Sequence, residues 1–411
     1  MSGTLRHTAR RLYFSLTTLC LALLVIGIAA TQAQAADPIT IQRNEATASF
    51  PEGITFALEA SGQRSITRVE LLYSVADDPT LNLLVPSFTP GKRIEIHHLL
   101  DLQVYYLPPG LDLTYHWRLV DDRGREVATE PQTLLWEDTR FDWQPLASAD
   151  VTVYAYTGNE AFNRLILDAA QSAVDQLKVE YGLSNIVPIR IWVYNSRDDF
   201  NATKQANEKH WAVGTAYSKY HLILATIPEG SKSEIGRVIP HEISHQLLSQ
   251  ATKNPFNAPP LWLDEGLAVR AQTVGNEDDF DQVKDAAAKG QLYSVRALIS
   301  EFPTTGPYHL AYAESYSIVN FIIEHYGLEK LQALIAVYRE GVSHDEALMR
   351  TLGVDTAGLD QLWKASLNYQ GDHPDGVGGT AGSRSPTSEL GAAVLAAALM
   401  CAMLFALLRR S

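Results

Sequence analysis

The sequence predicts an α+β protein in which strands come first and helices follow. Residues 39–143 form a series of strand-length apolar or alternating runs separated by turn residues. From residue 233 onward, nearly all apolar positions instead recur with the period of a helix. Because blocks of strands and blocks of helices pack as separate layers, these two observations indicate an α+β architecture with more than one folded unit.

The N-terminal end has the pattern of a secretory signal. Three arginines precede an apolar run over residues 19–30, and Ala33-Gln34-Ala35 then supplies a small-x-small cleavage site. A basic region, an apolar core and such a site are typical of a signal peptide, which we expect at residues 1–36. The alternative is an uncleaved signal that stays in the membrane as an anchor.

The C-terminal end predicts a membrane anchor. Residues 390–408 carry no charge, and Arg409-Arg410 follows at once. A helix over this run would span about 28 Å, and the arginines should remain cytoplasmic. We therefore expect a single-pass cell-membrane protein with its main domains on the extracytoplasmic side, joined to the anchor by a flexible linker at 371–389. A tail that is cleaved and replaced by another anchor is the alternative.

Composition narrows the function classes. The chain has 411 residues with 33 basic and 47 acidic side chains, giving a formal charge of −14, so a nucleic-acid partner is not expected. Its two cysteines, Cys20 and Cys401, both lie in the apolar ends, which leaves the part between them without a disulfide. That part is longer than one core usually serves, so two domains are expected. The sequence indicates no particular oligomeric state.

The first domain, residues 37–148, is expected to be an immunoglobulin-like β-sandwich. Strands are predicted near residues 55–58, 69–75, 103–106 and 113–120, with turn residues such as Ser61-Gly62 between them. Strand-length runs at this spacing, with no helical stretch among them, are typical of such sandwiches. No catalytic residue stands out, so an accessory role in spacing or docking is expected.

The second domain, residues 149–370, mixes both periods. Strands are predicted at 151–156, 189–194 and 221–226, and a helix at 160–181 that Gly182 ends. Helices are predicted for nearly all of the chain after residue 233. This order predicts a small sheet with helices segregated from it.

The strongest motif is His241-Glu242-Ile243-Ser244-His245. On a helix, residues four apart lie on one face, so both imidazoles can reach one ion while Glu242 sits beside it. A hydrolytic zinc site takes three protein ligands and leaves the fourth position to water. Glu265, in the segment WLDEGLA (262–268), is the candidate third ligand; alternatively it only interacts with the N-terminal end of its own helix.

These motifs resemble those of the gluzincin zinc metallopeptidases of the peptidase MA type, whose relatives include thermolysin and the M1 aminopeptidases. The resemblance implies a thermolysin-like zincin domain with a small sheet plus helices. It implies Zn²⁺ held by His241, His245 and Glu265, and a peptide or protein substrate. Glu242 would be the general base for a zinc-activated water. By the same resemblance, residues 220–226 would be an exposed edge strand that pairs with an extended substrate; an ordinary paired strand is the alternative.

A stabilising donor for the oxyanion is sought among tyrosines at 308, 312 and 316, which recur on one face of the helix expected at 307–326. The resemblance favours Tyr312, with Tyr316 as the second choice. Packing of these rings in the core is the alternative for either residue.

Three departures from the family pattern qualify these expectations. Glu314-Ser315 stands where the corresponding M1 segment usually has Lys-Gly. Pro240 stands directly before His241, which predicts a kinked helix or one that starts after residue 233. No GAMEN-like segment precedes the motif, so endopeptidase rather than aminopeptidase activity is expected. The alternative from another function class is a noncatalytic cell-surface binding or scaffold protein built on a zincin domain. The intact Glu242 argues against it, since a scaffold needs no base beside the metal.

Overall fold

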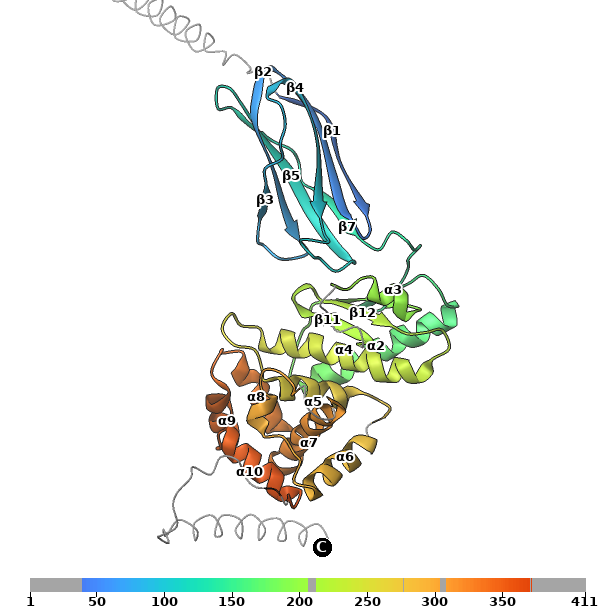
Figure 1. Ribbon diagram of the computed structural model, residues 1–411, viewed down its shortest axis with the longest axis vertical. Coiled ribbons are helices and arrows are strands. Elements are labelled where there is room, and N and C mark those ends of the chain that lie inside the picture. The colour runs from blue at the N-terminus through green and yellow to red at the C-terminus, as the bar shows by residue number, and fades with distance from the viewer. Residues whose placement is uncertain (1–38, 206–211, 276, 304–307, 370, 372–411) are drawn as a thin grey trace, which may run out of the picture.

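The computed structural model describes residues 39–205, 212–275, 277–303, 308–369 and 371. They form three tiers: an all-β domain, a second sheet with helices on one side, and a group of helices (Figure 1). The α+β prediction is confirmed. The predicted signal peptide and transmembrane helix lie outside the described residues, as does nearly all of the predicted linker. Within the described part of the chain, no helix has both the length and the apolar character of a membrane span.

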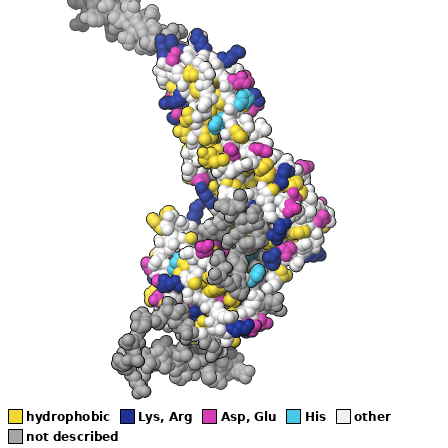
Figure 2. All heavy atoms as spheres, in the orientation of Figure 1, with side chains coloured by type: hydrophobic (Ala, Val, Ile, Leu, Met, Phe, Trp, Pro, Cys, Tyr) yellow, Lys and Arg dark blue, Asp and Glu magenta, His cyan; other side chains and the backbone are white. Residues whose placement is uncertain are grey.

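The N-terminal domain is a seven-stranded antiparallel sheet organised around one long strand. The first half of that strand, β2, pairs with β1 and β4, and its second half pairs with β3 and β5. The strands are β1 (Thr40–Ser49), β2 (Gly53–Val75), β3 (Asn82–Leu84), β4 (Gly91–Asp101), β5 (Leu111–Asp121), β6 (Glu126–Ala128) and β7 (Gln132–Trp136). Figure 2 shows hydrophobic side chains exposed on this domain down to its junction with the rest of the molecule.

Two local predictions in this domain are wrong. Ser61-Gly62 does not turn the chain, because β2 continues through it with only irregular pairing between Ser61 and Ile66. The segment 103–106 is a turn that follows β4, in which the Asp101 carboxylate accepts hydrogen bonds from the next backbone amides. Both errors arise because alternating polarity does not reveal where the partner strand ends.

The second sheet has the order β11-β12-β10-β9-β8, with β9, β10 and β12 parallel. Its strands are β8 (Gln144–Ala147), β9 (Val151–Ala155), β10 (Ile189–Tyr194), β11 (Gly214–Tyr217) and β12 (Leu222–Thr226). β8 and β9 form an antiparallel hairpin, so the domain boundary expected at 148/149 falls inside this sheet.

Both faces of the second sheet are buried. One face, including Ile191 and Ile223, packs against α2 (Glu160–Glu180) and α4 (Lys232–Thr252). The other face, including Trp192 and Leu224, belongs to the core of the N-terminal domain. This is why β10 is apolar at every position except Arg190 instead of alternating between apolar and polar residues. The sheet therefore connects the two domains through shared side-chain packing.

The third tier consists of helices that lie below α4 in Figure 1. Gly266 permits close packing of α5 on α7, since a Cβ there would overlap the Ser315 carbonyl. The remaining elements are α3 (Arg197–Asn201), η1 (Ser218–Tyr220), α5 (Leu261–Ala271), α6 (Glu277–Ala288), η2 (Val295–Leu298), α7 (Tyr308–Tyr326), α8 (Leu328–Tyr338), α9 (His344–Leu352) and α10 (Thr356–Ser366).

Candidate metal centre

Helix α4 carries the HEISH motif and accommodates Pro240 without ending. The predicted late start of this helix is therefore wrong. Proline cannot donate to the carbonyl four residues back, which here is that of Gly236. That carbonyl instead accepts hydrogen bonds from the Thr273 amide at 2.9 Å and the Thr273 hydroxyl at 3.3 Å. Thr273, in the segment after α5, thus supplies the hydrogen bonds that Pro240 cannot donate to the Gly236 carbonyl.

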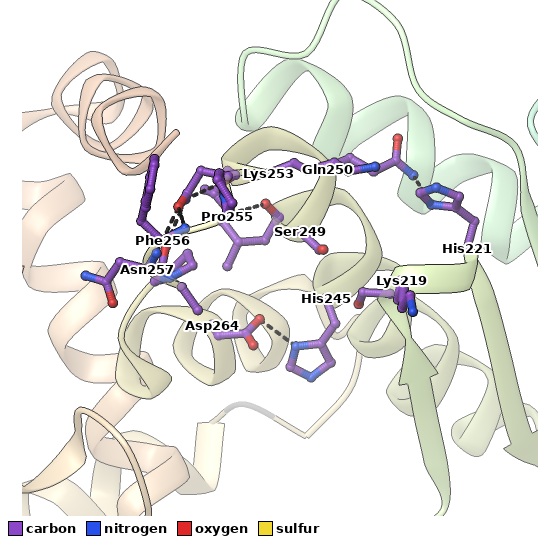
Figure 3. A pocket seen from close by; sticks show the side chains of 16 residues that line it. Lys219, His221, His245, Ser249, Gln250, Lys253, Pro255, Phe256, Asn257 and Asp264 are labelled. Carbon is purple, nitrogen blue, oxygen red and sulfur yellow. Dashed lines mark hydrogen bonds and ion pairs between the residues drawn. The ribbon is translucent and has the colours of Figure 1, made fainter. Parts of the chain in front are cut away.

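Helix α5 presents two adjacent carboxylates to α4. Asp264 accepts a hydrogen bond from Nδ1 of His245 at 2.6 Å, as Figure 3 shows. Gln272, just beyond the end of α5, lies 3.0 Å from Nδ1 of His241. With both Nδ1 atoms engaged from outside, the two Nε2 atoms are turned toward each other and lie 3.2 Å apart. Outer partners of this kind orient metal-binding imidazoles.

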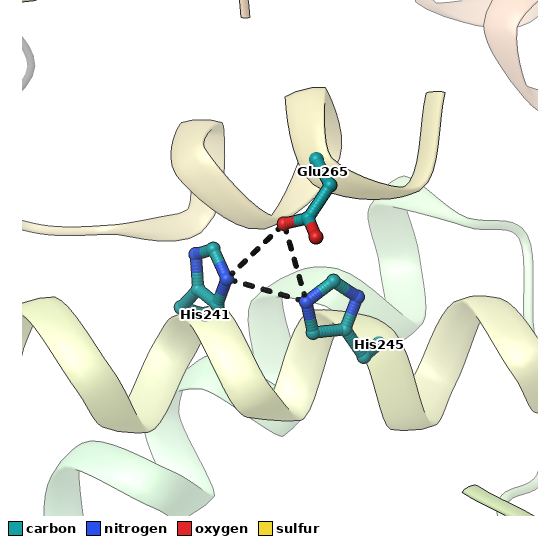
Figure 4. A group of neighbouring side chains, drawn as sticks. All are labelled: His241, His245 and Glu265. Atoms are coloured by element: carbon teal, nitrogen blue, oxygen red, sulfur yellow. Dashed lines mark hydrogen bonds and ion pairs between the residues drawn. The ribbon is translucent and has the colours of Figure 1, made fainter. Parts of the chain in front are cut away.

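Glu265 completes a group of three converging side chains (Figure 4). Its Oε2 atom lies 3.5 Å from Nε2 of His241 and 3.6 Å from Nε2 of His245. Tetrahedral ligands at zinc bond lengths of 2.0–2.1 Å are separated from one another by about 3.3 Å. The three donor atoms are therefore spaced as a zinc ion would require, and their nitrogen and oxygen chemistry suits zinc.

Charge at this site also favours a cation. Burial lowers the pKa of His245, but Asp264 and the two neighbouring glutamates outweigh burial and raise that pKa to about 10. Without a metal, the imidazole is therefore protonated and balances the surrounding carboxylates. A divalent cation could supply the same compensation.

Glu242 is buried, with 6% of its surface exposed, and lies against the edge of the second sheet. A Cβ on Gly214 of β11 would overlap the Glu242 carboxylate, so only glycine leaves room for it. Burial raises the pKa of Glu242, and Glu265 and Asp264 raise it further, while the two imidazoles oppose the shift.

The structure separates the two tyrosine candidates. Tyr312 lines the cleft, and its hydroxyl donates to Oε1 of Glu265 at 3.5 Å. Tyr316 is buried one turn later on α7, where its ring packs on Phe280. It is not among the residues that line the cleft. The side chain at position 308 lies outside the described part of the chain.

The strand predicted to bind substrate is not at the edge of the sheet. Residues 222–226 form β12, which pairs with β10 on one side and β11 on the other. The edge is β11, which among the described residues pairs with β12 alone. The unbroken apolar run at 222–225 is a sequence signal of an interior strand that the prediction did not use, whereas the short, mixed β11 gives no clear strand signal.

The three converging side chains open into a cleft of about 750 Å³. Its walls come from β11, from α4, from the start and end of α5, and from Tyr312 of α7. Asp264, Gln272, Thr273 and Gly214 were not predicted from the sequence. Of these, only Asp264 had a signal, because it directly precedes Glu265.

Comparison with known proteins identifies this half of the chain. Residues 169–369 match the family model of the peptidase MA superfamily. This segment, just under half of the chain, is similar to the peptidase MA superfamily. The matched segment contains the HEISH motif, Glu265 and Tyr312, so the candidate metal centre lies within the part of the chain that matches the family model. This similarity suggests a peptidase-like hydrolase.

Other comparisons add no argument to the peptidase MA assignment. No curated protein matches the chain. The Br derivative of BhCBM56 is 15% identical over 24% of this chain and 99% of its own, with a TM-score of 0.16. A family 56 β-1,3-glucan binding domain is 19% identical over 22% and 95%, with a TM-score of 0.15. A family 64 β-1,3-glucanase from Paenibacillus barengoltzii is 16% identical over 30% and 27%, with a TM-score of 0.16. Scores this low do not indicate a shared fold.

Proposed function

We propose that this protein is a zinc metallopeptidase that cleaves peptide bonds within extended substrates. The observation that carries the proposal is the convergence of His241, His245 and Glu265, whose donor atoms lie 3.2–3.6 Å apart beside the buried Glu242. A purely structural cluster would not require a second glutamate next to three donors so spaced.

His241, His245 and Glu265 would hold the zinc ion. When bound, zinc would supply a Lewis acid and lower the pKa of a water molecule. Asp264 and Gln272 hold the imidazole rings from behind, which fixes the direction of both Nε2 atoms.

Glu242 is the proposed general base. Burial raises the pKa of Glu242 toward neutral pH, and a base with such a pKa can both accept a proton and later release it. It would accept a proton from the attacking water and deliver it to the departing amine. Because Gly214 has no side chain, strand β11 can lie directly against the Glu242 carboxylate.

Tyr312 is the proposed donor to the oxyanion that forms at the scissile carbonyl. Its hydroxyl lies in the cleft close to Glu265, and a hydroxyl there could stabilise developing negative charge. The position of Tyr316 in the core favours a packing role for that residue.

Strand β11 is the proposed docking edge for substrate. An extended peptide can add to a sheet edge through main-chain hydrogen bonds, and β11 lies along the cleft beside Glu242. Hollows lie on both sides of His245, one along Val238 and His241 and the other along Leu248 and Thr252. A cleft that continues past the site in both directions suits an endopeptidase.

The proposal includes the setting of the site. It comprises an N-terminal immunoglobulin-like β-sandwich, a thermolysin-like zincin domain that includes the β8–β9 hairpin, and a linker at 371–389. A transmembrane helix over 390–408 would anchor the enzyme. The signal pattern of residues 1–36 and the terminal arginine pair support an extracytoplasmic position at the cell membrane.

The proposed function is tested by peptide digestion with the purified full chain, with and without a zinc chelator. Glu242→Gln should retain zinc but lower kcat/KM by at least about a hundredfold, because it removes only the base. Zinc-replete wild-type protein that leaves a diverse peptide mixture intact would contradict the proposal and favour a binding or scaffold role.

A further inference from the structure

A second cavity, of about 550 Å³, continues the catalytic cleft beyond His245. Ser218, His245 and Asp264 line both hollows, so the two meet at the metal centre. The stripe of α4 that carries the histidines extends into this cavity through Leu248 and Thr252. Figure 3 shows its lining side chains.

The outer wall of this cavity is a loop with a fixed conformation. Asn254 organises the loop: its amide nitrogen lies 2.8–2.9 Å from the carbonyls of Thr252, Asn257 and Tyr338. Its side-chain oxygen accepts hydrogen bonds from the amides of Phe256 and Asn257. The loop is therefore tied to the end of α4 and to the end of α8.

This fixed loop presents an exposed aromatic ring. Phe256 is 81% exposed although it lines the cavity, and Pro255, Pro259 and Leu248 add apolar surface to the same hollow. The ring rests against Gly341, where a Cβ would lie 2.8 Å from it, so its place is set from behind. A concave site that holds apolar surface in a rigid frame is suited to binding a ligand.

We infer that this cavity is a specificity subsite that receives a large apolar side chain of the peptide substrate, with Phe256 as its specificity-determining residue. The inference rests on the proposed function for its choice of occupant, because the cavity opens into the candidate catalytic cleft. Two lysines, Lys219 and Lys253, also line the cavity, and Lys219 is paired with Asp78 at 2.7 Å, so its charge is already compensated.

The combined length of the two hollows fits one extended peptide. Val238 and Thr252, which line the two hollows, are separated by about 21 Å along α4. An extended peptide covers that length with about six residues. A substrate docked on β11 could thus place its scissile bond at the metal centre and another side chain against Phe256.

The test compares cleavage sites in a diverse peptide mixture for the full-length wild type, Phe256→Ala and Phe256→Leu. Wild-type sites should be enriched in Phe, Leu, Met or Tyr at one fixed position from the scissile bond. For the wild type, kcat/KM should be about tenfold higher for a peptide with Phe at that position than for the same peptide with Ala there. The ratio should fall toward one in Phe256→Ala and stay high in Phe256→Leu. Val179→Ala, at a site that is 73% exposed and lines neither cavity, is the control and should keep the wild-type ratio.

Binding separates this inference from the proposed function. An Ala/Ser-rich fluorescein-labelled peptide with one central Phe is titrated into Glu242→Gln, and into the same variant with Phe256→Ala. If the zinc-replete wild type hydrolyses no peptide but the labelled peptide still binds Glu242→Gln more tightly than Glu242→Gln, Phe256→Ala, the subsite is supported and only the peptidase proposal is overturned. Hydrolysis without an apolar preference, with a preference for acidic residues, or with a preference that survives Phe256→Ala would overturn the subsite alone.

Discussion

At the residue scale, the candidate metal centre is defined by an excess of carboxylates around two imidazoles. Asp264 differs from the other acids because it contacts the outer nitrogen of His245 rather than the centre of the group. A carboxylate there fixes the ring and increases the basicity of the opposite nitrogen. Its role is to position a ligand, so its loss should weaken metal binding without removing a ligand.

Asp264→Asn should therefore lower zinc affinity by about 10- to 100-fold, as is usual when such an outer partner is lost. The affinity is measured by competition with a chromophoric chelator. Asp281→Asn, on the exposed side of α6, serves as the control for loss of one negative charge. An Asp264→Asn protein with wild-type zinc affinity would show that the bond to His245 does not position the ring for metal.

Glu314 is a second residue with an unusual environment, two positions after Tyr312 on α7. Burial raises the pKa of its carboxyl to about 8, against the Tyr293 amide and Lys364, which favour the charged form. Between about pH 4.5 and 8, the folded protein thus keeps a proton that the unfolded chain releases. The contribution of this group to stability is complete below pH 4.5 and is lost as pH rises toward 8.

We predict that Glu314→Gln will flatten the fall in stability over this pH range. As the pH rises, the free energy of unfolding of the variant should increase relative to that of the wild type by up to about 1.4 kcal/mol per pH unit. Denaturant unfolding at pH 5, 6, 7 and 8 measures it. A difference that is constant across these pH values would mean that Glu314 is ionised in the folded state.

At the element scale, the connection between α4 and the segment after α5 sets the geometry of the site. Pro240 removes one helical hydrogen bond, and Thr273 replaces it at the Gly236 carbonyl. The adjacent Gln272 reaches His241 from the same segment. Pro240 therefore leaves the Gly236 carbonyl free to accept hydrogen bonds from Thr273. These bonds hold the segment that carries Gln272, the partner of His241.

Gly236→Ala should disturb this connection, since its Cβ would lie 2.5 Å from the Thr273 hydroxyl oxygen. We expect a loss of about 1–3 kcal/mol in stability, the usual cost of overpacking, together with weaker zinc binding as Gln272 is displaced. Thermal unfolding and chelator competition measure the two effects. The double variant Gly236→Ala, Thr273→Ala removes the clash and should recover part of the lost stability. If it is no more stable than the single variant, the clash is not the cause.

At the scale of the whole molecule, the second sheet is a shared layer rather than part of one domain. Trp192 packs between Trp143 and Tyr154, and Gly110 of the N-terminal domain lies directly against its ring. Arg190 pairs with Asp112 across the same junction at 2.8 Å. Separating the domains would expose this aromatic face to water.

A fragment of residues 149–371 should therefore aggregate or unfold at a markedly lower temperature than a fragment of 37–371. It loses β8, the hairpin partner of β9, as well as the covering domain. Light scattering and thermal unfolding distinguish the two fragments. Equal unfolding temperatures and a monodisperse short fragment would show that the helical domain folds independently of its neighbour.

This shared layer also explains what the sequence could and could not predict. Helices and the HEISH segment follow from local periodicity and spacing, so 160–181 and the grouping of His241 with His245 could be read directly. Pairing partners could not, because which strand lies at an edge depends on distant segments, as β11 and β12 show. Gln272 and Gly214 reach the site only through tertiary packing, and neither belongs to a recognisable motif.

The central claim is that His241, His245 and Glu265 together hold one zinc ion, and metal analysis of the full-length protein tests it most directly. After dialysis against a weak chelator, the wild type should retain about one zinc per chain and Glu265→Ala far less, because two imidazoles alone bind zinc poorly. Glu265→Asp should be intermediate. Equal zinc content in the wild type and Glu265→Ala, or none in either, would contradict the account.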